Sequence, residues 1–146
     1  MIRTIGIEDI PRLLELIQLH ASFERASFNP LGKKRALENA FFREVPDLYG
    51  FVSVVDEKIE GYTTYMRQYS TWDAAYYLYI DCLFLTEEVR GKGYGAKLMQ
   101  RVRQEAERMG YKLIQWQTPP FNKRAISFYN RLGAQAKTKE RFFWNL

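Results

Sequence analysis

The sequence has 146 residues, a net charge of +5 and a hydrophobic content of 47%, which together indicate one folded domain over residues 1–146. This composition excludes a disordered chain, a collagen and a coiled coil. The basic surplus favours an anionic partner, but it does not choose among nucleic acid, a membrane surface and a phosphorylated cofactor.

Signals for membrane insertion or export are lacking. The apolar run at residues 76–80 is far shorter than the ~18 residues of a membrane-crossing helix. The amino terminus has no apolar segment of the kind that directs export. Cys82 is the single cysteine, which excludes an internal disulfide and a cysteine-based metal cluster. We therefore expect a cytoplasmic protein with no metal and no membrane partner.

The first half of the chain predicts a strand, two helices and a hairpin. A short alternating segment precedes apolar residues at helical spacing, and β-branched and aromatic residues then mark the hairpin around a turn at 56–60. In chain order, these elements are strand Ile2–Ile5, helices Glu8–Phe23 and Lys33–Phe42, and strands Tyr49–Asp56 and Gly61–Gln68.

The second half alternates strands and helices, which predicts an α/β fold with a mixed sheet covered by helices. The strand Tyr76–Leu85 carries a single charge, Asp81, so we expect it to be central and buried on both faces. The elements that follow are helix Gly93–Met109, strand Leu113–Thr118, helix Asn122–Leu132, and two β-type segments at Ala134–Lys137 and Arg141–Asn145.

A glycine-rich loop joins that central strand to the longest helix. Residues 90–95 read Arg-Gly-Lys-Gly-Tyr-Gly, and the glycines let bare backbone N–H groups approach a ligand. The helix start adds unpaired N–H groups and a positive dipole end, so the loop suits a phosphate or diphosphate. A P-loop is excluded by spacing. A dinucleotide-binding fold is excluded because no carboxylate ends the next strand.

The loop instead matches the pattern [QR]-x-x-G-x-[GA] through Arg90, Gly93 and Gly95, and residues 122–134 read N-x-x-A-x-x-F-Y-x-x-x-G-A. Together with the strand 78–85, these motifs resemble the GNAT superfamily of N-acetyltransferases over nearly the whole chain. The segments 23–24 and 69–72 are most similar to its diamine (polyamine and thialysine) acetyltransferase branch. That branch carries two adjacent carboxylates on the central strand, where this chain has Asp81 followed by Cys82.

The resemblance implies a GNAT-like α/β fold, a mostly antiparallel sheet of six to seven strands flanked by about four helices. It implies acetyl-CoA as the acyl donor and a homodimer, in which the aromatic run 142–144 either takes part or fills the core. Lys123 and Arg124 either meet the cofactor's 3′-phosphate or form a solvated helix start. The residues that the resemblance assigns to cofactor binding are Leu83, Leu85, Arg90, Gly91, Lys92, Gly93, Tyr94, Gly95 and Asn122.

Acetyl transfer from a thioester to an amine requires a neutral amine, a stabilised oxyanion and a protonated leaving thiolate. A lysine-like amine is neutral in only about 1 in 2,500 molecules at pH 7, a cost of about 4.6 kcal/mol. A carboxylate can accept the surplus proton, and Glu24 and Asp81 are the candidates, each as base or as ammonium binder. Glu24 is equally consistent with a solvated helix end. The resemblance assigns the general acid to Tyr129, which periodicity alone would place in the core.

Three functions stay open: an N-acetyltransferase for a small polyamine-like or amino-acid-like amine, a protein-lysine acetyltransferase, and a non-catalytic acyl-CoA-binding module. Nucleic-acid binding is disfavoured, because Glu105 and Glu107 interrupt the basic face of the longest helix. His20 is expected to lie away from the chemistry. The residues expected to shape the acceptor pocket are Trp72, Asp73, Tyr76, Tyr77 and Tyr79.

Overall fold

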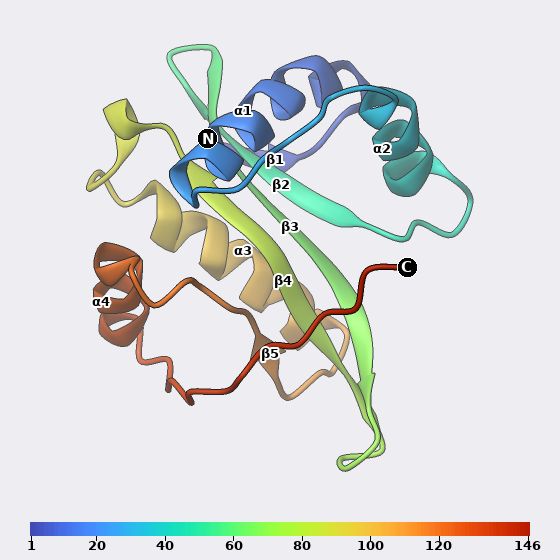
Figure 1. The fold of residues 1–146 in the computed structure, drawn as a ribbon, viewed down its shortest axis with the longest axis vertical. Helices are drawn as coiled ribbons and strands as arrows, with labels where there is room; N and C mark the ends of the chain where they lie inside the picture. Colours follow the sequence, from blue (N-terminus) through green and yellow to red (C-terminus); the bar gives the residue numbers. More distant parts are fainter.

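Five strands, ordered in space as in sequence, form the sheet of the computed structural model, which describes residues 1–146 (Figure 1). Neighbouring strands are antiparallel except β4 and β5, which run parallel. The strands are β1 (Ile2–Thr4), β2 (Tyr49–Val55), β3 (Lys58–Ser70), β4 (Ala75–Leu85) and β5 (Ile114–Gln115). The helices are α1 (Ile10–Phe23), α2 (Lys33–Phe42), α3 (Tyr94–Arg108) and α4 (Lys123–Arg131), with single 3₁₀ turns at Ile7–Asp9 and Glu87–Val89.

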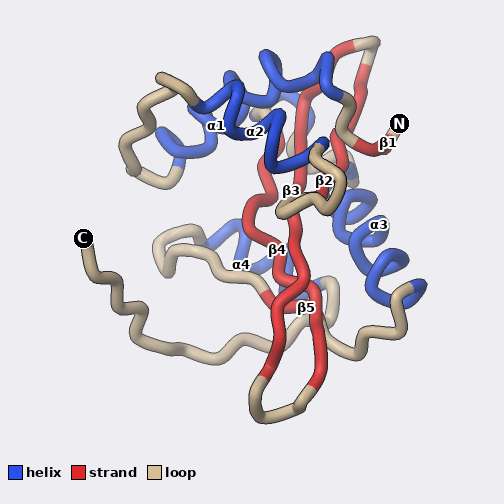
Figure 2. The backbone as a smooth tube through the Cα atoms, turned by 90° about the vertical axis from the view of Figure 1, so that its right-hand side faces the viewer, coloured by secondary structure: helices blue, strands red, loops and turns tan.

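The sheet divides the core into two layers, as the apolar periodicity predicts. On one face, α1 buries Ile10, Leu13 and Leu16 completely, at the three- to four-residue spacing of one helix face. On the other face, α3 buries Leu98 and Val102 against the strands. Figure 2 shows α1 and α2 together on one side of the sheet, with α3 apart from them. None of the helices combines the length and the apolar character that crossing a bilayer requires.

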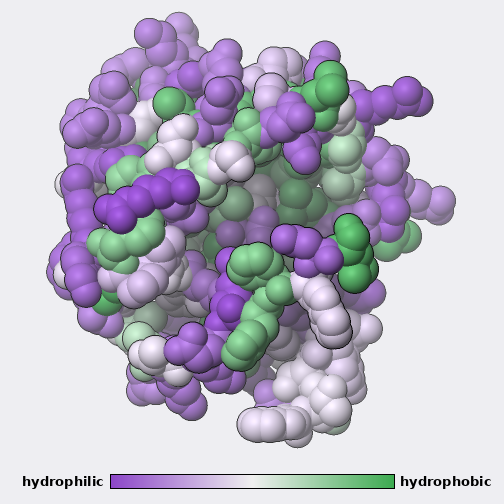
Figure 3. Space-filling model, viewed as in Figure 1, coloured by the Kyte–Doolittle hydropathy of each residue, from purple (hydrophilic) through white to green (hydrophobic).

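Fewer strands form than the six to seven that we predicted, because residues 134–146 form none. Their aromatic residues favour β structure, but a strand needs a partner edge, and β5 offers only 2 residues. This carboxyl-terminal segment crosses the sheet in Figure 1 and stands away from it in Figure 2. Phe142, Phe143 and Trp144 are 91%, 79% and 92% exposed. Hydrophobic side chains accordingly lie on the surface along its path (Figure 3).

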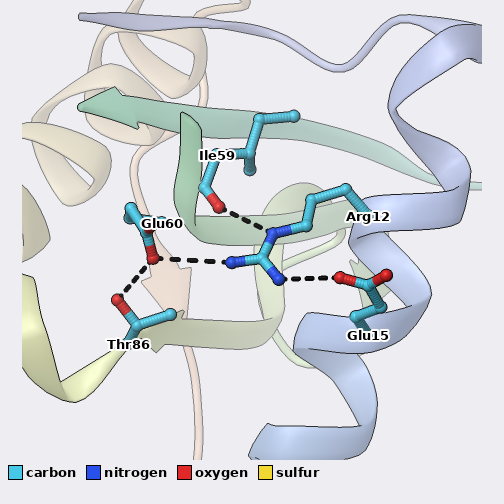
Figure 4. A network of polar contacts seen from close by, with 5 residues as sticks. All are labelled: Arg12, Glu15, Ile59, Glu60 and Thr86. Carbon is cyan, nitrogen blue, oxygen red and sulfur yellow. Dashed lines mark hydrogen bonds and ion pairs between the residues drawn. The ribbon is translucent and has the colours of Figure 1, made fainter. Parts of the chain in front are cut away.

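A polar network fixes α1 over the sheet near the end of β4 (Figure 4). The Arg12 guanidinium donates to the carbonyl of Ile59 at 3.0 Å and pairs with Glu15 at 2.7 Å and Glu60 at 3.5 Å. Glu60 also accepts a hydrogen bond from the Thr86 hydroxyl at 2.8 Å. The network therefore joins the amino-terminal part of α1 to the start of β3 and to the residue after β4.

An ion pair with a buried carboxylate and a half-buried arginine joins β1 to the start of α1. The Asp9 carboxylate is 4% exposed and accepts hydrogen bonds from both terminal nitrogens of Arg3, at 2.6 and 2.8 Å. It also accepts one from the backbone N–H of Gly6 at 2.7 Å. The hydrogen bond from Arg3 is the largest of the effects that lower the pKa of Asp9.

We predict that Asp9→Asn lowers the free energy of unfolding at pH 7 by about 2–4 kcal/mol, because Arg3 loses its buried counter-ion. Folding lowers the pKa of Asp9. Its stabilising contribution is therefore present above the unfolded pKa and is lost as the pH falls through the folded pKa. Urea unfolding of both proteins should show the difference shrinking as the pH falls below about 4, the ordinary pKa of an aspartate.

The matched control is Asp47→Asn, which breaks the solvent-exposed pair with Arg43. It should cost under about 1 kcal/mol at pH 7. Equal losses in the two variants would contradict a special role for the buried pair.

Candidate active site

The parallel pairing of β4 with β5 ends after two residue pairs. Beyond them β4 continues to Leu85, whereas the chain after β5 leads to α4. A cavity of about 370 Å³ lies between these segments, with Leu83 and Leu85 on one side and Gln117 and Thr118 on the other. This part of the β4 edge has no neighbouring strand, so an extended ligand can lie along it.

A bulge in β4 presents Asp81 to this cavity. Cys82 pairs with Thr64 and Ile80 pairs with Tyr65, which leaves Asp81 as the extra residue. Bulges re-aim side chains, and they are common beside active sites. Asp81 is exposed, and its carboxylate accepts one weak hydrogen bond, from the Cys82 thiol at 3.7 Å. The prediction of a strand buried on both faces is thus wrong at Asp81, because β5 ends too early to cover it.

The glycine loop lines the cavity at the amino end of α3. Gly91 and Gly93 adopt left-handed backbones with φ of 78° and 85°, which other residues adopt only at a cost. A Cβ at Gly93 would meet no protein atom within 4 Å, so the space above it is free for a ligand. Gly95 has a different role, since a Cβ there would come within 3.2 Å of Phe128 in α4. All three glycines line the cavity.

Arg90 and Arg124 place two cations beside this loop, and both line the cavity. Burial first, and then the charge of Arg124, lower the pKa of Arg90. The Arg90 Nε donates to the carbonyl of Leu85 at 2.9 Å, and its guanidinium lies over the Phe23 ring at 4.5 Å. An anion between the two guanidinium groups would relieve their repulsion, so the part of the cavity beside these two arginines suits a diphosphate.

Carboxylates line the same cavity, and α1 brings His20 there, with Glu24 directly after the last residue of the helix. His20 Nε2 lies 3.2 Å from a Glu24 oxygen, and Nδ1 lies 2.9 Å from the hydroxyl of Tyr62. Burial is the main effect on the pKa of His20 and lowers it. The prediction that His20 lies away from the chemistry is therefore wrong. Its spacing of four residues from Glu24 places both on one helix face, a signal that the sequence contains.

Tyr129 reaches the cavity from α4. Its ring packs edge-to-face against Trp116, with the ring centroids 5.2 Å apart. Burial, and to a smaller extent the charge of Glu24, raise the pKa of Tyr129 to about 12. The phenol is therefore protonated at neutral pH, which suits a proton donor and not a base.

Most of the sequence-predicted site residues line this one cavity. It brings together Glu24, Asp81, Leu83, Leu85, Arg90, Gly91, Gly93, Gly95, Asn122 and Tyr129. Lys92 and Tyr94 do not line it, because alternate loop residues face away, and the Tyr94 ring lies under Lys97 at 5.2 Å. Asn122 also caps α4 by accepting a hydrogen bond from the N–H of Ala125 at 3.2 Å.

The residues expected to shape the acceptor pocket, four aromatic residues and Asp73, lie outside this cavity. None of the five lines it. Trp72 is 97% exposed at the tip of the hairpin between β3 and β4, which projects at the bottom of Figure 1. These residues precede the bulge at Asp81, whereas the cavity lies beyond it.

Comparison with known proteins agrees with this geometry. A sequence model of the acetyltransferase (GNAT) family matches residues 13–134. A thialysine N-epsilon-acetyltransferase from Bos taurus is 29% identical over 147 residues, covering 95% of this chain and 86% of that protein. An L-ornithine N5-acetyltransferase from Arabidopsis thaliana is 31% identical over 94 residues, covering 63% of this chain and 41% of that protein.

Solved structures share the fold. An aminoglycoside acetyltransferase from an uncultured soil metagenomic sample superposes with a TM-score of 0.82 at 20% identity, covering 100% of this chain and 95% of that one. The family match spans most of the chain and includes α1, the glycine loop and α4. The chain therefore belongs to the GNAT acetyltransferase family, and it is an N-acetyltransferase.

Proposed function

We propose that this enzyme transfers the acetyl group of acetyl-CoA to a primary amine of a small polyamine-like or amino-acid-like acceptor. The observation that carries the proposal is one cavity, lined both by Arg90, Arg124 and the glycine loop and by two carboxylates. An anionic donor and a cationic acceptor would thus each find groups of opposite charge there. Relatives named for thialysine and ornithine, amino acids with a side-chain amine, support this acceptor class.

The residues present fit acetyl-CoA, which would supply the acetyl thioester. The diphosphate would bind the backbone amides of residues 91–95, to which Lys92 and Tyr94 contribute backbone alone, together with Arg90 and Arg124. The pantetheine arm would lie along Leu83 and Leu85, opposite Asn122. The left-handed glycines and the unpaired β4 edge support this assignment.

The reaction would proceed by direct attack. Glu24 and Asp81 attract the acceptor ammonium, and one of them takes its proton. The freed nitrogen forms a bond to the thioester carbonyl carbon, and the carbon–sulfur bond breaks. The departing thiolate takes a proton from the Tyr129 hydroxyl, whose raised pKa keeps that proton in place until the thiolate forms. The attacking nitrogen loses its second proton to the resulting phenolate, which leaves a neutral amide and restores the phenol.

We also propose a homodimer, with the exposed aromatic residues 142–144 in its interface. Three aromatic side chains in a row exceed the scattered apolar exposure of an ordinary monomer surface. The single cysteine supports a reducing, cytoplasmic location.

An acceptor screen that measures thiol release from acetyl-CoA tests the proposed function. Spermidine, ornithine, thialysine and lysine-containing peptides would be compared at equal concentration. We expect turnover with small amines and little with peptides. Turnover of peptides alone would favour a protein-lysine acetyltransferase, and tight CoA binding without turnover of any amine would favour a non-catalytic module.

We predict that Tyr129→Phe lowers kcat about 10²-fold or more while CoA affinity is kept, because only the proton donor is removed. Steady-state kinetics and calorimetric CoA binding give the two quantities. Tyr77→Phe is the matched control, since this phenol donates to Gln68 at 2.8 Å outside the cavity. Unchanged turnover in Tyr129→Phe would remove this residue from the mechanism.

The pH profile offers a second measurement on Tyr129. Because its pKa is about 12, the proton donor stays protonated through the alkaline range. At saturating substrates, kcat should rise or level off up to about pH 10 as the acceptor amine becomes neutral. A fall in kcat with a midpoint below that pH would contradict a buried phenol as the acid.

We predict that Gly93→Ala weakens CoA binding about tenfold or more. Alanine adopts the left-handed backbone only at about 1–2 kcal/mol, and its methyl group would enter the free space above the loop. Gly110→Ala is the matched control, because Gly110 has φ of 75° and lies just beyond the far end of α3, where a Cβ would also meet no protein atom within 4 Å. Calorimetry should show normal affinity in the control, and equal weakening in both would contradict an anion site at Gly93.

A further inference from the structure

A series of polar contacts leads from the core to Glu24, one of the carboxylates that line the cavity. It begins at the Tyr62 hydroxyl, on a fully buried side chain of β3. It continues through His20, whose Nδ1 lies 2.9 Å from that hydroxyl. It ends at Glu24, 3.2 Å from His20 Nε2. Of these residues, His20 and Glu24 line the cavity.

The positions of the hydrogen atoms in these contacts follow from the Glu24 carboxylate, at which the contacts end. An ionised carboxylate only accepts hydrogen bonds, so His20 Nε2 carries a proton and donates it to Glu24. Nδ1 of a neutral imidazole then accepts from the hydroxyl of Tyr62. The imidazole is fixed in this orientation by stacking on Phe84, with the ring centroids 5.1 Å apart. The hydroxyl of Tyr62 therefore donates to His20, and Nε2 of His20 donates to Glu24.

The two candidate bases differ in how they are held. Asp81 is exposed, and the hydrogen bond that its carboxylate accepts comes from a weak thiol donor at 3.7 Å. Glu24 instead accepts from an imidazole that is itself fixed on its other side. A carboxylate that must meet an ammonium at a set position benefits from this restriction of its rotamers.

We propose that His20 is a positioning residue for the base of the acetyl transfer, holding one Glu24 oxygen so that the other faces the acceptor. This inference rests on the proposed function. In the step concerned, a proton passes from the acceptor ammonium to the free oxygen of Glu24, and the nitrogen keeps the electron pair with which it attacks.

A double-mutant cycle on kcat tests the proposal with wild type, His20→Leu, Glu24→Gln and the double variant. His20→Leu should lower kcat about tenfold, with the KM for acetyl-CoA unchanged. In the Glu24→Gln background, the same substitution should cost nothing further, because there is no carboxylate left to position. His20→Gln should recover most of the loss, since its amide can donate to Glu24 in place of Nε2. Equal losses in both backgrounds would overturn the proposal.

A spectroscopic measurement keeps the test decisive if His20→Leu folds poorly. The chain has 1 histidine, so the imidazole ¹⁵N signals need no assignment. Wild type should show a neutral ring protonated at Nε2 near neutral pH. The groups that face the ring include Glu24 and Asp81, which raise its pKa, and Arg90, which lowers it, while burial has the largest effect. Glu24→Gln should therefore lower the pKa of His20 further.

The outcomes distinguish a failure of the proposed function from a failure of the role of His20. A wild type that acetylates no amine would contradict the proposed function. A wild type that turns over normally, with a ring protonated at Nδ1 or unaffected by Glu24→Gln, would overturn the role of His20 and leave the proposed function standing.

Discussion

The separation of β4 from β5 is the constraint on which the site depends. Had the two strands paired along their full length, β5 would cover the β4 edge and the bulge at Asp81. Two features limit the pairing. The sequence continues from Thr118 into Pro119 and Pro120, which lack the N–H that a central strand must donate. In addition, α4 packs beside the gap, and the missing side chain of Gly95 admits Phe128 there.

The cavity that results carries charges of both signs. Arg90, Arg124 and the amino end of α3 supply positive charge, while Glu24 and Asp81 supply negative charge. Tyr129 borders the same space, and the charge of Glu24 contributes to its raised pKa. These groups match a reaction between a phosphorylated donor and a cationic acceptor. The chemistry then needs only short proton transfers to a carboxylate and from a phenol.

Sequence patterns predicted well what depends on local periodicity. The sequence predicted a helix at Gly93–Met109 with the glycine loop at its amino end, and the structure has α3 there, with Leu98 and Val102 buried. The motif around Tyr129 predicted a residue that lines the cavity, although periodicity alone favoured the core. Each of these features lies within a few turns of a single helix, where the spacing of residues in the sequence determines which helix face they share.

Features that depend on pairing between distant segments were not predictable. Whether Asp81 is buried depends on where β5 ends and on a one-residue bulge against β3. The carboxyl-terminal segment has β-type residues but no partner edge within the chain, so propensity did not yield a strand. His20 was overlooked as a lone histidine, because its partner Tyr62 is 42 residues away in sequence.

A crystal structure of the protein with coenzyme A would test the central claim most directly. We predict density for the diphosphate against the backbone amides of residues 91–95, and for the pantetheine arm along the unpaired edge of β4. The thiol should end near Tyr129. Coenzyme A bound outside this gap, or a β4 edge that pairs with residues 116–118 when the ligand is present, would contradict the claim.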